Sequence, residues 1–73
     1  MACISPDGKP TESGTKMLRA LESGLGTPEE IAKEARLALF KVRSGLRELT
    51  QAELANQKGE RYELSEKGAE LIK

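Results

Sequence analysis

The 73-residue chain contains no histidine and no tryptophan, and Cys3 is its single cysteine. One cysteine excludes a disulfide within the chain, and the lack of histidine argues against a nitrogen–sulfur metal site. Enzymes most often use histidine as a general base, which this chain lacks. The sequence also contains no phosphate-binding glycine loop and no nucleophile beside a candidate base. We therefore predict no metal, no cofactor and no enzymatic activity. Cys3 is either a free thiol near the terminus or half of a bridge between two chains.

Long apolar runs are also missing. No segment approaches the roughly 20 apolar residues that cross a bilayer, and the N-terminus lacks the apolar stretch of a signal peptide. We therefore expect a reduced, cytoplasmic protein without a membrane segment. Only 3% of the residues are aromatic, so the core of this one small domain must consist mainly of Leu, Ile, Val and Ala. That composition suits helices better than a large sheet.

A net charge is absent as well, because 12 basic residues balance 12 acidic ones. Proteins that bind duplex DNA use Lys and Arg at phosphates, so this balance argues against a simple DNA-binding protein. The distribution is uneven, however. Segment 38–51 carries three basic residues against one acidic residue, whereas segment 27–37 carries three acidic residues against two basic ones. A local positive face can therefore exist without a basic field over the whole molecule.

The clearest positive signal in the chain is a helix start. Thr27 can accept a backbone hydrogen bond as the N-cap, Pro28 suits the first helical turn, and Glu30 completes a capping box. The sequence therefore predicts a helix over 28–35. An earlier helix is expected from residues 11–13 to residues 23–24, and its inner face carries Met17, Leu18 and Leu21.

A third helix is predicted over 38–51, because apolar side chains recur there at spacings of three and four. The inward residues of this stripe are Leu39, Val42, Leu46 and Leu49. The opposite arc holds Phe40, Lys41, Ser44, Arg47 and Glu48, with Arg43 at its border. The preceding link, Arg36-Leu37, contains no glycine, although such turns often do.

The remaining segments predict a hairpin and a last helix. Residues 54–64 form two short strand-like arms around Gly59, and Ser65 is the N-cap of a helix over 66–72. Leu71 and Ile72 are expected to return to the core. Gly68 within this helix costs about 1 kcal/mol against alanine, which reflects either a close approach or simple tolerance. Residues 1–11 form an N-terminal arm, in which residues 2–4 either add a short strand or remain loose.

Three segments match motifs of one known superfamily. They are Thr27-Pro28-Glu29-Glu30-Ile31-Ala32, Val42-Arg43-Ser44-Gly45-Leu46-Arg47-Glu48-Leu49 and Arg61-Tyr62-Glu63-Leu64-Ser65-Glu66-Lys67-Gly68. In that order they resemble the second helix, the recognition helix and the second wing strand with closing helix of winged helix-turn-helix DNA-binding domains of prokaryotic regulators. The resemblance covers about residues 13–72. It implies a mostly helical α+β fold over 12–73, with a three-helix core, a β-hairpin wing and a short C-terminal helix.

The resemblance further implies a small transcriptional regulator that binds double-stranded DNA. Helix 38–51 would enter the major groove, with the 54–64 hairpin as the wing. The base readers would be Arg43, Ser44 and Arg47, and the backbone contacts would be Lys41, Lys58 and Arg61. Both sets are also compatible with ordinary solvated side chains. A homodimer or a protein partner remains open.

Phe40 supports an alternative function. As the one phenylalanine, on the outward arc, it could press against a thymine methyl group, anchor a protein interface, or fold into the margin of the core. A winged-helix protein–protein interaction module that does not read DNA is therefore the rival interpretation. Tyr62 on the second strand is expected at the edge of the core with its hydroxyl at the surface.

Overall fold

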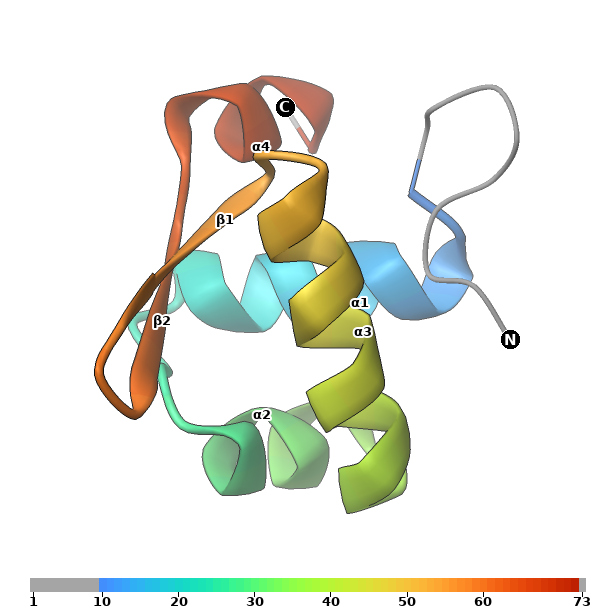
Figure 1. Cartoon of the computed structure of the whole chain (residues 1–73). Helices are drawn as coiled ribbons and strands as arrows, with labels where there is room; N and C mark the ends of the chain where they lie inside the picture. Colours follow the sequence, from blue (N-terminus) through green and yellow to red (C-terminus); the bar gives the residue numbers. More distant parts are fainter. Residues whose placement is uncertain (1–9, 73) are drawn as a thin grey trace.

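Three helices, a hairpin and a final short helix follow one another along the chain in the computed structural model, which describes residues 10–72 (Figure 1). The elements are α1 (Glu12–Glu22), α2 (Pro28–Ala35), α3 (Leu39–Gln51), β1 (Ala55–Lys58), β2 (Arg61–Leu64) and α4 (Glu66–Leu71). The predicted mostly helical α+β class is confirmed. The predicted bounds of α2 agree at both ends, and those of the other helices agree within about a residue. Cys3 and the possible strand at residues 2–4 lie outside the described residues.

Side-chain caps fix the starts of three helices. The capping box of α2 is complete, because the Glu30 N–H donates to Thr27 Oγ1 and the Thr27 N–H donates to Glu30 Oε1, each over 3.3 Å. Thr11 caps α1 through the Gly14 N–H, and Ser65 caps α4 through the Gly68 N–H. Helix α3 begins after Ala38 without a side-chain cap. These hydrogen bonds satisfy backbone donors that a helix start otherwise leaves free.

The turn between α2 and α3 is tight although it lacks glycine. Arg36 adopts the left-handed conformation, with φ 56° and ψ 44°, which non-glycine residues seldom take. Its N–H and that of Leu37 both donate to the Ala32 carbonyl oxygen. Arg36 therefore serves as the C-cap that glycine commonly provides, and α3 can start three residues later.

The hairpin pairs β1 and β2 in antiparallel register, from Ala55 opposite Leu64 to Lys58 opposite Arg61. Gly59 opens the two-residue turn with φ +63°, a conformation that glycine adopts without strain. Because side chains alternate along a strand, Lys58 and Arg61 share one face of the hairpin, and the Gln57–Tyr62 pair occupies the other. The hairpin therefore presents two chemically different faces.

The core lies where α1 crosses behind α3, with α2 and the hairpin at its sides (Figure 1). Its largest fully buried side chains are Met17, Leu18, Ile31, Val42, Leu46, Leu49 and Leu54. Most of the predicted inward residues are confirmed, as are the burial of Ile72 and the half-buried position of Tyr62 against this core.

Two inward predictions are wrong. Leu39 is 37% exposed and Leu71 is 41% exposed. Leu39 is the first residue of α3, at the corner after the turn, where the core ends. Leu71 and Ile72 are neighbours about 100° apart around a helix axis, so one-sided packing of the short α4 buries only Ile72.

Candidate nucleic-acid interface

The outer face of α3 is a continuous stripe of exposed side chains: Phe40, Arg43, Ser44, Arg47 and Gln51. Spacings of three and four place them along one side of the helix. Phe40 is 74% exposed, the most exposed large apolar side chain among the described residues. Of its three sequence interpretations, folding into the core margin is therefore wrong.

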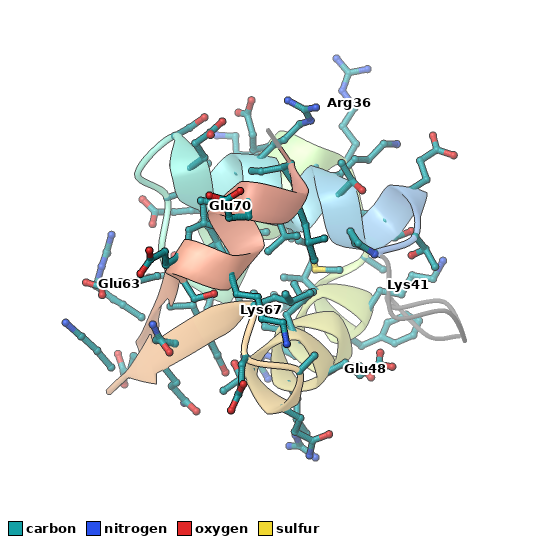
Figure 2. All side chains as sticks on the ribbon, turned by 90° about the horizontal axis from the view of Figure 1, so that it is seen from above. Arg36, Lys41, Glu48, Glu63, Lys67 and Glu70 are labelled. Atoms are coloured by element: carbon teal, nitrogen blue, oxygen red, sulfur yellow. The ribbon has the colours of Figure 1, made fainter. Side chains whose placement is uncertain are left out.

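The predicted orientation of α3 needs a small correction. Arg43, which was expected at the border of the outward arc, is exposed, whereas Lys41 and Glu48 are half-buried. The reason is that Gly45 is buried with Val42 and Leu46, while Leu39 is not. This shift in the inward set turns Arg43 outward and Lys41 toward the flank. Figure 2 shows Lys41 on the opposite side of the molecule from Glu63 of the hairpin.

A groove of about 410 Å³ separates α3 from the hairpin and extends to the start of α2. Its lining combines the first turn of α2, two arginines of α3 and one face of the hairpin: Thr27, Pro28, Glu29, Arg43, Arg47, Gln57, Gly59, Glu60 and Tyr62. The groove brings together the predicted readers Arg43 and Arg47. Its four ionised side chains are these two arginines, Glu29 and Glu60, so their charges balance.

The predicted wing residues lie elsewhere. Neither Lys58 nor Arg61 lines the groove, because both project from the other face of the hairpin. The sequence interpretation missed Gln57, Glu60 and Tyr62 as groove residues. Strand alternation places Gln57 and Tyr62 together on the face opposite Lys58 and Arg61, but it does not show which of the two faces lines the groove.

Three candidate cations form ion pairs with glutamates. Arg43 lies 4.0 Å from Glu29, Arg61 lies 3.8 Å from Glu30, and Lys58 lies 3.2 Å from Glu63. All six side chains are about half exposed or more, so each pair contributes little to stability. Within residues 10–72, Arg47 makes no ion pair. Of the two arginines in the groove, Arg47 can therefore bind a ligand without first leaving a glutamate.

The carboxylate of Glu30 joins the start of α2 to the hairpin. Its Oε1 accepts hydrogen bonds from Thr27 Oγ1 (3.0 Å), the Thr27 N–H (3.3 Å) and the Gly26 N–H (3.4 Å). Hydrogen bonds from the side chain and backbone of Thr27, that from Gly26 and the charge of Arg61 lower the pKa of the Glu30 carboxyl. The Tyr62 N–H also donates to the Gly26 carbonyl oxygen over 2.8 Å. The hairpin is thereby fixed to the loop before α2.

Other functional sites find little support in the described part of the chain. Residues 10–72 hold no group of three or more His, Cys, Asp or Glu side chains placed to bind a metal ion. None of the helices over these residues is long and apolar enough to cross a membrane. Comparison with protein-family models gives no match for the chain, and comparison with curated proteins gives no significant match. The groove and the exposed face of α3 are therefore the features of residues 10–72 that bear on function.

Proposed function

We propose that the protein is a small winged helix-turn-helix DNA-binding protein and acts as a transcriptional regulator. One observation carries this proposal: Arg43 and Arg47 of the exposed α3 stripe form one wall of a groove whose other wall is the hairpin. The 13 residues of α3 span about 20 Å at a rise of about 1.5 Å per residue. The major groove of B-form DNA is about 12 Å wide and admits one helix of this kind.

The stripe supplies suitable chemistry for reading DNA. Arg47 can donate two hydrogen bonds to a guanine edge, Ser44 can bond either a base or a phosphate, and Phe40 can contact a thymine methyl group. Arg43 lies 4.0 Å from Glu29 at the start of α2, at the edge of the groove, which suits a contact with the DNA backbone as well as with a base.

The basic residues outside the stripe are assigned to the backbone and to positioning. Lys41 on the flank of α3 and Lys58 beside the hairpin turn would meet phosphates. Arg61 is held by Glu30, so its main role in this proposal is to position the hairpin. A homodimer on a symmetric operator would strengthen binding, because single small readers bind weakly.

A binding measurement with matched charge variants tests this function. We would measure fluorescence anisotropy of a labelled mixed-sequence duplex of about 15 base pairs, at low and moderate salt. Arg47→Gln should weaken binding about threefold or more at low salt. Lys67→Gln removes an equal charge from α4, which lies at the opposite end of the molecule from α2 (Figure 1). This variant should change the binding much less. Equal effects of the two variants would contradict the proposed interface.

The exposure of Phe40 favours a second candidate function. A phenylalanine that is 74% exposed beside the half-exposed Leu39 is typical of an anchor for a protein partner. Under this alternative, Phe40→Ala abolishes partner binding, whereas Lys41→Glu and Arg47→Glu leave partner binding nearly unchanged. A failure of the wild-type protein to bind any duplex at low salt would favour this candidate.

A further inference from the structure

The groove between α3 and the hairpin holds a carboxylate beside one of its two arginines. Glu29 Oε2 lies 4.0 Å from a terminal nitrogen of Arg43, and both side chains line the groove. Both are also more than half exposed to solvent. The pair can therefore separate without breaking any packing of the core.

Glu29 stands in the first turn of α2, where the helix dipole favours an anion. The neighbouring Glu30 is already engaged by Thr27, Gly26 and Arg61. The two consecutive glutamates thus have separate partners, one arginine from the hairpin and one from α3.

A phosphate that approaches Arg43 within the groove must come close to the Glu29 carboxylate. Two anions beside one guanidinium repel each other. Phosphate binding at Arg43 therefore favours separation of the 4.0 Å Glu29–Arg43 pair. Because phosphate contacts supply most of the affinity that is independent of sequence, this separation weakens that component most.

We propose that Glu29 competes with DNA phosphate for Arg43 and so limits non-specific binding. This inference depends on the DNA-binding function proposed above. In the free protein Glu29 lies beside the Arg43 guanidinium at the α2 edge of the groove, and on DNA a phosphate takes its place. Arg47, which has no ion-pair partner among the described residues, undergoes no such exchange.

The test compares Glu29→Gln with Glu34→Gln, which removes the same charge from the same helix. Glu34 lies on the side of α2 that faces α1, in a separate hollow lined also by Lys16 and Arg19. For a mixed-sequence duplex of about 15 base pairs at about 50 mM salt, Glu29→Gln should raise the affinity about three- to tenfold. Glu34→Gln should raise it less than about twofold, and both effects should shrink as added salt screens the charges.

A double-mutant cycle separates competition for Arg43 from a general effect of charge. In an Arg43→Gln background, the gain from Glu29→Gln should fall to that of Glu34→Gln. In the free protein, the Arg43 side-chain Nε–Hε NMR signal should shift in Glu29→Gln and stay in place in Glu34→Gln. A gain that persists without Arg43, or equal gains from the two glutamate variants, overturns the competition while leaving the DNA-binding function standing. Failure of both the wild type and Glu29→Gln to bind duplex at low salt overturns the DNA-binding function and this inference with it.

Discussion

Gly68 in α4 lies so close to Leu54 that a Cβ atom on the glycine would overlap the Leu54 carbonyl oxygen. The same carbonyl accepts the Ser65 N–H over 3.2 Å, and Ser65 Oγ donates to the Glu53 carbonyl oxygen over 2.7 Å. The start of α4 is therefore docked on the loop between α3 and β1. Of the two sequence interpretations of Gly68, the close approach is confirmed and simple tolerance is wrong.

Gly68→Ala should therefore destabilise the protein, although alanine is the better helix former. Helix propensity alone predicts a gain of about 1 kcal/mol, but displacing α4 from backbone atoms should cost about 2 kcal/mol or more. Urea denaturation followed by circular dichroism measures the free energy of unfolding. A variant more stable than the wild type would show that α4 can move away from Leu54 at little cost.

Gly26→Ala makes a matched comparison, because a Cβ there would lie 2.9 Å from two nitrogens of the Arg61 guanidinium. This neighbour is the end of a flexible and half-exposed side chain, so it can move aside. We expect a change in unfolding free energy below about 1 kcal/mol, with amide shifts concentrated at Arg61 and Tyr62. A loss as large as that of Gly68→Ala would mean that the hairpin is fixed more rigidly than the ion pair implies.

Glu30 should make stability depend on pH. Because its pKa is lower in the folded protein than in the unfolded chain, the carboxylate stabilises the fold above the unfolded value of about 4.3. This contribution is lost as pH falls through the lower folded pKa. Comparing urea denaturation of the wild type and Glu30→Gln from pH 7 to pH 2 isolates it, since glutamine can retain the capping hydrogen bond.

The stability difference between these two proteins should be constant near neutral pH and should shrink only under acidic conditions. A carboxyl ¹³C NMR titration of Glu30 provides an independent check. A Glu30 pKa at or above the ordinary value for a glutamate side chain would contradict the hydrogen-bond network around Thr27.

Phe40 should contribute almost nothing to folding. With most of its surface exposed, Phe40→Ala should change the unfolding free energy by less than about 0.5 kcal/mol. Leu46→Ala in the same helix removes a fully buried side chain and should cost about 2–5 kcal/mol. Thermal or urea denaturation of both variants tests the contrast. A large loss for Phe40→Ala would place its ring in the fold and remove it from the candidate interface.

Local signals in the sequence were sufficient to predict the elements of the fold. The capping box at Thr27 and Glu30, the N-cap at Ser65 and the apolar stripe of α3 act within a few residues, so they can be read without tertiary contacts. The two wrong inward residues, Leu39 and Leu71, stand at helix ends. At a helix end, the exposure of a side chain depends on where the core stops. Local periodicity does not show this limit.

The candidate site was less predictable because it combines three separate elements. A helical pattern places Arg43 and Arg47 on the outside of α3, but which hairpin face meets them depends on how the strands pack. Arg43 and Glu29 are 14 positions apart in the sequence, and Arg61 and Glu30 are 31 positions apart. No local sequence pattern therefore indicates these two ion pairs.

The most direct test of the DNA-binding account is a backbone amide NMR titration of the ¹⁵N-labelled protein with a mixed-sequence duplex of about 15 base pairs, at low and then moderate salt. The account predicts shifts over residues 40–47 and around the hairpin turn at residues 57–61, which fade as the salt concentration rises. Amides of α4 should stay in place. If the α3 and hairpin amides do not move at low salt, this surface does not bind DNA, and Phe40 becomes the starting point for identifying a protein partner.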